Sequence, residues 1–479
     1  MENKTFYITT TLPYVNADPH VGFAAEIIRA DIIARSKKIQ GYDVFFNTGT
    51  DEHGQKLFDE ALKNGEDVKS YVTRYAKKFE GLKELLNLSD DLHFIRTTNE
   101  HHKKSAQYFW KLCKERGDIY KKNYRVKYCI GCELEKTDSE LLDGKCPVHP
   151  NRELEIREEE NYFFRWSKYQ KPLLDFYEKN PDFVLPSFRF NEIKKFVERG
   201  LEDFSISRLK SKMSWGVEVP DDSDHVMYVW FDALINYIST LGWPEDGENF
   251  KKFWVKGDPV QYAGKDNLRQ QSAMWQAMLM SAGLPNSKHI VINGFIQSGG
   301  QKMSKSLGNV INPYDVVSVY GSDVLRFYVA KELSWSEDSD MTTERIKESY
   351  NTYLANGLGN LVSRVMKMAE VNLEKPVDVE NEIKEFPEYF EFLNNFEINK
   401  ATDLIWVQIK ALDLMIQTEL PFKVVKTDLE KGKEIIKDLV KKLYLIALML
   451  NPIMPDTSRS IIQAIKLNKL EKPLFLRRE

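Results

Sequence analysis

The chain has 479 residues, of which 42% are hydrophobic and 12% aromatic, so we expect roughly two to four domains with sizeable cores rather than a disordered protein. Its formal net charge of −4 excludes a polycation and leaves only local basic patches for any contact with nucleic acid. Only four cysteines, no signal peptide and no bilayer-length apolar run favour a soluble cytoplasmic protein over a disulfide scaffold or a membrane protein.

The first predicted elements are a strand, a helix and a second strand. Residues 6–11 are rich in β-branched and aromatic side chains, which predicts a β-strand. Apolar residues then recur at helical spacing between Val21 and Ile33, and Gly41 is a suitable helix end. Residues 43–47 indicate the second strand. A strand–helix–strand unit of this length predicts a parallel sheet with its ligand site at the carboxyl ends of the strands.

Beyond residue 115 the character of the sequence changes twice. Residues 116–224 are charged and contain three of the four cysteines, and we interpret them as an insertion between two halves of the sheet. Strand-like runs at 227–230 and 289–292 indicate that the sheet then resumes. From Glu344 onward helical periodicity replaces the strand signals, as in 435–450, where apolar residues form one stripe.

Four potential metal ligands are spaced as two knuckles. Two residues separate Cys129 from Cys132 and Cys146 from His149, and thirteen lie between the two pairs. This spacing is typical of a tetrahedral zinc site, and Gly131 permits the tight turn of the first knuckle. Four protein ligands leave no open coordination position, so the predicted zinc is structural.

Two other segments suit a nucleotide. His20 and Gly22 stand where the first helix begins, and there the free N–H groups and the helix dipole favour phosphate. Lys302 and Lys305 straddle a serine in a loop that begins with glycines, an arrangement suited to a polyphosphate. Alone, a histidine at a helix start is more often a cap or a surface residue, and a Lys/Ser loop is often only solvated. The two segments together favour a nucleotide site.

These two segments resemble the signature sequences of class I aminoacyl-tRNA synthetases, and nearly the whole chain resembles the methionyl-tRNA synthetase family. Five further segments carry the likeness: 12–14 (Leu-Pro-Tyr), 48–54 (Thr-Gly-Thr-Asp-Glu-His-Gly), 228–233 (Tyr-Val-Trp-Phe-Asp-Ala), 264–266 (Gly-Lys-Asp) and 356–361 (Asn-Gly-Leu-Gly-Asn-Leu). The resemblance implies that ATP and methionine form methionyl-adenylate and pyrophosphate. The terminal adenosine of tRNA would then take the methionyl group.

With this resemblance the predicted fold class is α/β. A Rossmann-like parallel-sheet catalytic domain with a zinc-binding insertion is expected before an all-α C-terminal domain that binds the anticodon. The expected segments are 1–115 and 225–343 for the two halves of the catalytic domain, 116–224 for the insertion and 344–479 for the helical domain.

The resemblance also implies roles for single residues in adenylate formation. Positioned cations are expected to stabilise the charge that develops on the phosphates, without redox or covalent catalysis. The catalytic residues implied are His20, Lys302 and Lys305, and the ATP site implied adds Gly22, Gly264 and Asp266. Asp51 would hold the α-ammonium group by a charge-assisted hydrogen bond, next to an apolar pocket that suits a thioether. The other residues implied for the amino-acid site are Leu12, Tyr14, Trp230, Ala233, Tyr237, Gln271 and Trp275.

In the helical domain Asn360 and Arg364 share a helix face and match the family's anticodon-reading positions. A capping asparagine and an ion-paired arginine are about equally expected from the helix face alone. Phe422 offers a stacking face where the family usually has tryptophan.

The cofactors implied are structural Zn²⁺ and Mg²⁺ with ATP. The partners implied are ATP, methionine and methionine-specific tRNA, including the initiator. With no membrane contact and no oligonucleotide-binding domain appended after residue 479, a monomer is expected.

Three positions depart from the family pattern, because Phe23, Gln271 and Asn293 stand where histidine is usual. Two alternative functions stay open. The first is a class I synthetase for another apolar amino acid, although the insertion is too small and too zinc-like for the editing domain of most such enzymes. The second is a tRNA-binding paralogue that has lost catalysis, which only Phe23 and Gln271 support.

Overall fold

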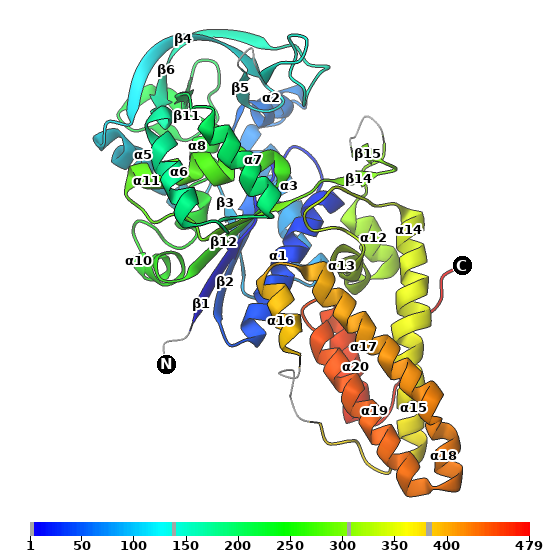
Figure 1. The fold of residues 1–479 in the computed structure, drawn as a ribbon. Coiled ribbons are helices and arrows are strands. Elements are labelled where there is room, and N and C mark those ends of the chain that lie inside the picture. The colour runs from blue at the N-terminus through cyan, green and yellow to red at the C-terminus, as the bar shows by residue number, and fades with distance from the viewer. Residues whose placement is uncertain (1–3, 137–139, 304–307, 380–385) are drawn as a thin grey trace. The chain divides into compact units, whose positions relative to one another are not determined.

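The structure is a computed structural model that describes residues 4–136, 140–303, 308–379 and 386–479 (Figure 1). Among these residues no helix is both long enough and apolar enough to cross a membrane. The chain forms two compact units whose segments alternate along the sequence. The first unit comprises Met1–Pro19, Gly41–Gly81 and Asp90–Asn293, and the second comprises His20–Gln40, Leu82–Ser89 and Gly294–Glu479. The finer predicted division at residues 115, 224 and 343 stays a prediction.

A six-stranded parallel sheet forms the centre of the first unit. Its strand order is β3-β2-β1-β12-β13-β7, and every pair of neighbours is parallel. The strands are β1 (Thr5–Thr9), β2 (Asp43–Thr50), β3 (Leu92–Arg96), β7 (Val184–Leu185), β12 (Asp258–Gly264) and β13 (His289–Asn293). The predicted strands at 6–11, 43–47 and 289–292 are confirmed, and so is the parallel sheet. In such a sheet ligands bind beyond the carboxyl ends of the strands.

The chemistry of these strands explains their place. Tyr7 and Ile8 of β1 are fully buried, as expected for a central parallel strand that is covered on both faces. Helices of the first unit bury large aromatic side chains in the same core, among them Trp110, Phe231 and Trp275. The helices of this unit are α2 (Gln55–Lys63), α3 (Val68–Glu80), α5 (Glu100–Glu115), α6 (Gln170–Lys179), α7 (Ser187–Glu198), α8 (Val229–Ala233), α9 (Asn236–Ser239), α10 (Gly247–Asn249) and α11 (Trp275–Ala282). Short 3₁₀ or π-helical segments are η2 (Trp166–Tyr169), η3 (Phe250–Val255), η4 (Lys265–Asn267) and η5 (Gln270–Met274).

The segment predicted as an insertion contributes small antiparallel sheets. One sheet has the order β5-β4-β6-β8, and β4 (Ile119–Cys129) pairs with β6 (Glu155–Phe164) along their length. The shorter strands of this sheet are β5 (Leu134–Lys136) and β8 (Phe204–Ser205). A second sheet has the order β10-β11-β9, formed by β9 (Ser207–Leu209), β10 (Glu218–Val219) and β11 (Asp222–Met227). The first metal-ligand candidate, Cys129, is therefore the last residue of a long strand.

The predicted strand at 227–230 is wrong beyond its first residue. Met227 ends β11, which belongs to the small antiparallel sheet, and the next residues enter helix α8. The run Met-Tyr-Val-Trp is short and apolar, and such a run does not distinguish a buried strand from a buried helix. The central sheet resumes later, at β12, which pairs with β1.

In the second unit a buried ion pair explains why helix α1 (Val21–Ile39) groups with the C-terminal part of the chain. Arg326 of α13 (Ser322–Lys331) is fully buried, and its guanidinium lies 2.7 Å from the carboxylate of Asp31 in α1. The same guanidinium donates hydrogen bonds to the carbonyl oxygens of Pro452 and Ile453, at 2.7 and 2.9 Å. A buried charge that is paired and hydrogen-bonded in this way holds its segments together, since breaking the pair would leave an uncompensated charge.

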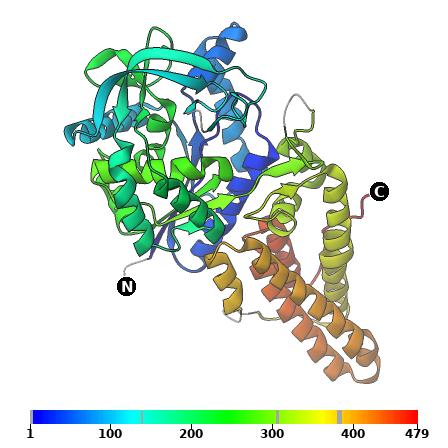
Figure 2. The same ribbon diagram turned by 45° about the horizontal axis from the view of Figure 1, so that its top comes forward.

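Beyond residue 342 the described residues form helices and the loops between them, with no strand, which confirms the predicted all-α C-terminal part. Four helices pack against one another and lie side by side in both views (Figures 1 and 2): α15 (Asn360–Asn372), α17 (Ile398–Glu419), α19 (Leu429–Leu450) and α20 (Pro455–Lys466). In α19 the predicted apolar stripe is buried, from Ile436 through Leu443 to Leu450. The remaining helical segments of this unit are α4 (Leu82–Leu85), α12 (Pro313–Tyr320), α14 (Thr343–Ser349), η7 (Tyr350–Gly359), α16 (Pro387–Asn394) and α18 (Pro421–Thr427). Its short strands are β14 (Ile296–Ser298), β15 (Gln301–Lys302) and β16 (Ser339–Asp340).

Candidate active site and metal centre

The predicted nucleotide residue His20 caps the N-terminus of α1. Its Nδ1 accepts a hydrogen bond from the N–H of Gly22 at 3.0 Å, so in the neutral ring the proton resides on Nε2, which is left to donate outward. Glycine at position 22 leaves room for this cap, because a Cβ there would lie 2.7 Å from Cε1 of the His20 ring and would displace the ring. The capping role and the donor role are therefore compatible, since they use different nitrogens of one ring.

Lys302 belongs to the same unit, and its positive charge affects the pKa of His20. Partial burial, and after it the charge of Lys302, lowers the pKa of His20, although part of the ring remains exposed. At neutral pH the ring is therefore a neutral hydrogen-bond donor. Lys302 itself is exposed at the end of β15, with its ammonium 5.4 Å from the ring centre of Phe295. Lys305 lies outside the described residues.

The turn before Lys302 depends on two glycines. Gly299 and Gly300 connect β14 to β15 with φ angles of 63° and 72°, a conformation that other residues rarely adopt. The N–H of Gly300 donates to the Asp340 carboxylate at 2.9 Å, which ties the hairpin to β16. The glycines noted in the sequence thus set the geometry of the hairpin that carries Lys302.

In the first unit, Tyr14 and Asp51 lie side by side beyond the carboxyl ends of β1 and β2. Their backbones form an isolated parallel bridge, and the N–H of Asp51 donates to the carbonyl of Pro13 at 3.0 Å. Asp51 is only 5% exposed, and its Oδ1 has no hydrogen-bond partner among the described residues. The hydroxyl oxygen of Tyr14 is likewise buried and has no hydrogen-bond partner among the described residues. Buried polar atoms are normally hydrogen-bonded, so this pair is the kind of site that a polar ligand group completes.

The buried and negatively charged surroundings of Asp51 favour a cationic ligand. Burial, followed by the negative charge of Asp232, raises the pKa of Asp51 well above its ordinary value. Both effects disfavour an isolated carboxylate, and an ammonium group bound nearby would counter both. An ammonium-binding role for Asp51 is therefore chemically consistent with its surroundings.

Three of the predicted methionine-pocket residues form a connected group. Gln271 donates through Nε2 to the hydroxyl of Tyr237 at 2.7 Å, and the rings of Tyr237 and Trp275 are 5.9 Å apart. Gln261 in turn donates to Oε1 of Gln271 at 2.9 Å. An amide has one donor side and one acceptor side, so Gln271 satisfies both neighbours at a position where the family usually has histidine.

The other predicted residues of the amino-acid and ATP sites lie on several elements of the first unit. Trp230 and Ala233 lie one turn apart on α8, and Leu12 is partly buried after β1. Gly264 ends β12, where a Cβ would lie 2.8 Å from Oδ1 of Asp266. The absence of a side chain at Gly264 therefore lets the Asp266 carboxylate lie close to the strand end.

A buried network that the sequence did not reveal supports helix α8. Asp232 accepts hydrogen bonds from His53 at 2.6 Å and from His102 at 2.9 Å, and all three side chains are buried. Burial raises the pKa of Asp232, but the charge of His53 and the hydrogen bonds of both histidines outweigh it and lower the pKa to about 2. His53 lies in the segment 48–54 and Asp232 in the segment 228–233, but no local pattern pairs them. His102 comes from α5.

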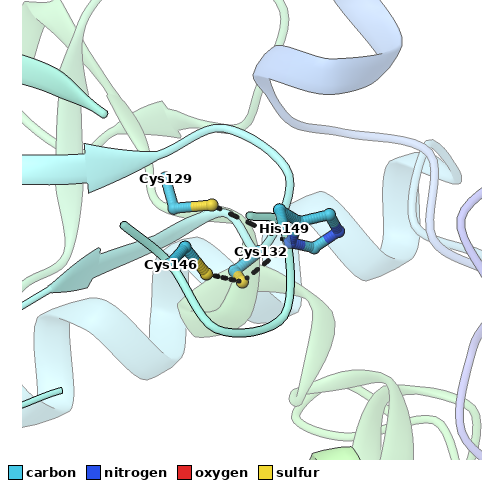
Figure 3. A group of neighbouring side chains, drawn as sticks. All are labelled: Cys129, Cys132, Cys146 and His149. Carbon is cyan, nitrogen blue, oxygen red and sulfur yellow. Dashed lines mark hydrogen bonds between the residues drawn. The ribbon is translucent and has the colours of Figure 1, made fainter. Parts of the chain in front are cut away.

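The four predicted metal ligands converge (Figure 3). The ligand atoms of Cys129, Cys132, Cys146 and His149 all lie within 4.8 Å of one another. The Cys132 sulfur is 3.4 Å from that of Cys146 and 3.2 Å from Nδ1 of His149. All of these cysteines are free thiols. A closed set of three thiols and one imidazole fits a tetrahedral metal ion, and zinc suits this donor set.

Gly131 is a sharp test of this centre, because a Cβ there would lie 2.6 Å from Cγ of the His149 ring. We expect Gly131→Ala to displace His149, to weaken zinc affinity by about 10- to 100-fold and to lower the thermal unfolding temperature. Metal analysis after dialysis against a weak chelator measures the first effect and calorimetry the second. Gly247→Ala is the matched control, since its Cβ would meet only the flexible Lys251 side chain at 3.6 Å. Equal zinc contents in the two variants would contradict the expectation.

In the helical part, the structure gives Arg364 a partner. Arg364 of α15 forms an ion pair with Asp413 of α17, and both side chains are about one-third exposed. Asn360, one turn earlier, lines an open hollow of about 400 Å³ together with Asn356 and Phe475. Phe422 on α18 is 44% exposed. The ion-paired alternative for Arg364 is therefore present, and all three predicted anticodon residues keep accessible surface.

The chain is similar to known tRNA synthetases. The family described as tRNA synthetases class I (M) matches residues 6–155 and 138–366. The methionine–tRNA ligase of Thermotoga maritima is 41% identical over 98% of this chain and 76% of its own, and that of Nostoc sp. is 38% identical over 96% and 90%. A solved structure of Mycobacterium tuberculosis methionyl-tRNA synthetase with methionyl-adenylate has a TM-score of 0.90 at 34% identity, covering 99% of this chain and 100% of that one.

The matching family model makes this chain a class I aminoacyl-tRNA synthetase, and the parallel sheet agrees with that class. Within that class, the near-complete coverage and the level of identity leave one assignment. The chain belongs to the methionyl-tRNA synthetase family.

Proposed function

We propose that this protein ligates methionine to its tRNA in two steps. ATP and methionine form methionyl-adenylate and pyrophosphate, and the 3′-terminal adenosine of tRNA then takes the methionyl group. Relatives named methionine–tRNA ligase match nearly the whole chain, and one solved structure similar to it is of a complex with methionyl-adenylate. The observation in the structure that carries the proposal is the buried Asp51, whose Oδ1 lacks a partner among the described residues at the carboxyl edge of the sheet.

Asp51 is proposed to hold the α-ammonium group of methionine through a charge-assisted hydrogen bond. Tyr14 lies beside it and offers a buried hydroxyl. Tyr237 and Trp275 are proposed to contact the thioether, because a polarizable sulfur makes favourable contacts with aromatic rings. Leu12, Trp230, Ala233 and Gln271 complete the proposed amino-acid site.

Adenylate formation needs charge stabilisation more than any other form of catalysis. The methionine carboxylate attacks the α-phosphorus, the bond to pyrophosphate breaks, and negative charge grows on the phosphate oxygens. We assign the stabilising donors to Nε2 of His20, the free N–H groups at the start of α1, Lys302 and Lys305. Gly22 permits close approach of the phosphates, and Gly264 and Asp266 are assigned to the adenosine. Mg²⁺ bound with ATP would add further positive charge at the phosphates.

The metal centre has a different task. Zinc held by Cys129, Cys132, Cys146 and His149 would have four protein ligands and therefore no open position for a substrate. We propose that it is structural and that it closes the two knuckles into one folded segment.

The experiment that tests the function is ATP–pyrophosphate exchange with each of the twenty amino acids. Methionine should support the fastest exchange, and norleucine should be a weak substrate, because an apolar pocket separates such analogues by only about 1–3 kcal/mol. Faster exchange with leucine, isoleucine, valine or cysteine would indicate a class I synthetase of another specificity. Tight tRNA binding without exchange for any amino acid would indicate a paralogue that has lost catalysis.

The proposed tRNA partners are the methionine-specific tRNAs, including the initiator, and the anticodon is assigned to Asn360, Arg364 and Phe422. Arginine stacking and amide hydrogen bonds are common ways to read unstacked bases. We also propose that the protein acts in the cytoplasm as a monomer. Charging assays with initiator and elongator tRNAs, and the mass of the protein in solution, test these points.

Arg364→Ala is expected to slow tRNA charging by about tenfold or more while sparing pyrophosphate exchange, because a lost stacking contact is worth about 1–3 kcal/mol. Asp413→Asn is the matched control, since it breaks the same ion pair but keeps the guanidinium. Steady-state charging and exchange rates of both variants decide the question. The anticodon assignment is wrong if the two variants lose charging equally, since Arg364 would then serve only its ion pair.

A further inference from the structure

We propose that Glu133, the residue after the metal ligand Cys132, positions the methionine site by joining the metal knuckle to the two segments that carry that site. This inference rests on the proposed function. Glu133 is 2% exposed, although it follows a knuckle whose neighbouring residues are partly exposed. A glutamate is rarely buried unless its charge is paired or hydrogen-bonded, so each of its contacts has to be accounted for.

The first contact of Glu133 reaches the segment that carries Asp51. Its Oε1 accepts a hydrogen bond from the N–H of Lys56, in the first turn of α2, at 2.7 Å. The N-cap residue of α2 is Gly54, which has no side chain to accept from these N–H groups. Glu133 therefore supplies from the knuckle the acceptor that a capping side chain normally supplies locally. Because α2 begins at Gln55, four residues after Asp51, this contact fixes the path of the chain leaving the proposed ammonium site.

The second contact reaches the segment that carries the side-chain pocket. The carbonyl oxygen of Glu133 accepts a hydrogen bond from the hydroxyl of Tyr228 at 2.5 Å. Tyr228 is the N-cap residue of α8, the helix on which Trp230 and Ala233 lie. The remaining carboxylate oxygen, Oε2, accepts from the hydroxyl of Tyr128 at 2.9 Å, which binds the side chain back to the end of β4. One residue thus contacts the knuckle and both walls of the proposed methionine site.

The backbone around Glu133 shows that this arrangement is imposed by its surroundings. Glu133 has φ 54°, in the left-handed region that glutamate rarely adopts. Gly54 has φ 111°, and a Cβ there would lie 3.2 Å from Oε1 of Glu133. Unfavoured backbone of this kind persists where neighbouring structure determines it, and it is common at functional sites. The hydrogen bonds from Lys56, Tyr128 and Tyr228 are the neighbouring contacts that hold Glu133 in this conformation, and a metal bound by the knuckle would fix the residue before it, Cys132.

The test compares Glu133→Ala and Glu133→Gln with the wild type in methionine-dependent pyrophosphate exchange. We expect Glu133→Ala to raise KM for methionine roughly tenfold, with KM for ATP and the zinc content of the protein unchanged. Glu133→Gln should restore most of the loss, because its amide oxygen can still accept from Lys56. Glu153→Ala is the matched control, since Glu153 lies in the same segment and is exposed.

A smaller change guards against misfolding of the alanine variant. Tyr228→Phe removes only the hydroxyl that donates to Glu133 and should raise KM for methionine by several-fold without changing KM for ATP. The proposal is overturned if Glu133→Ala leaves KM for methionine unchanged. A second result also overturns it: Glu133→Ala loses zinc, its KM values for methionine and for ATP rise together, and Glu133→Gln does not restore them. Glu133 would then only maintain the fold. A wild-type protein without methionine-dependent exchange is a separate result, which refutes the proposed function itself.

Discussion

Replacing Lys302 by alanine is expected to slow methionyl-adenylate formation by about 10²–10³-fold, the usual cost of losing one preorganised donor. In the proposed role of Lys302, the negative charge that it stabilises grows on the phosphates only as the transition state is approached. ATP affinity should therefore change little, while the rate constant of the chemical step falls. Phe23 strengthens this expectation, because it has no donor to offer at a position where the family usually has histidine.

Pre-steady-state measurement of adenylate formation at varied ATP concentration separates affinity from rate. Lys305→Ala, in the same signature segment, should show the same pattern as Lys302→Ala, and Lys375→Ala, an exposed lysine of the same unit, should behave as the wild type. A Lys302 variant that binds ATP much more weakly yet reacts at the normal rate when saturated would show that Lys302 only anchors the ground state.

Asp51→Asn is expected to raise KM for methionine by about 10²-fold or more. Truncating one partner of a buried charge-assisted pair costs about 2–5 kcal/mol, and the asparagine amide carries no negative charge for the ammonium group. KM for ATP should stay close to the wild-type value. Asp175→Asn, an exposed residue of the same unit, is the control. Equal increases in both KM values would contradict the assignment of Asp51 to the amino acid.

The pH dependence of methionine binding gives an independent check on Asp51. Burial first, and then the charges of Asp232, Glu133 and Glu52, raise its pKa in the free protein. Binding of an ammonium group favours the carboxylate, so affinity for methionine should rise with pH up to this raised pKa and level off above it. KM for methionine measured at saturating ATP should therefore increase as the pH falls, starting above the ordinary range of a carboxyl group. Asp51→Asn should remove this dependence, and an unchanged pH profile in that variant would assign the titration to another group.

Local chemistry made several features of this protein predictable. The spacing of Cys129, Cys132, Cys146 and His149 needs no knowledge of distant segments, because each knuckle closes over two residues. The helix after His20 and the stripe along α19 follow from periodicity, which the chain carries along its own length. The prediction of a strand at 227–230 was wrong because local sequence alone did not decide the structure there. Its apolar run fits a buried strand and a buried helix equally well, and only its neighbours decide between them.

The sequence by itself therefore predicted the class of fold from periodicity and the cluster of metal-ligand candidates from short-range spacing, while the reaction followed from the family resemblance of its motifs. Only the tertiary structure decided how the sites are supported. Asp232 meets His53 from 179 residues away and His102 from 130 residues away, and Glu133 meets Lys56 across 77 residues. No local pattern encodes such contacts, because each residue alone is an ordinary acid, base or backbone donor. Their pairing arises when the packing of the whole unit buries them together and an unpaired buried charge would cost too much free energy.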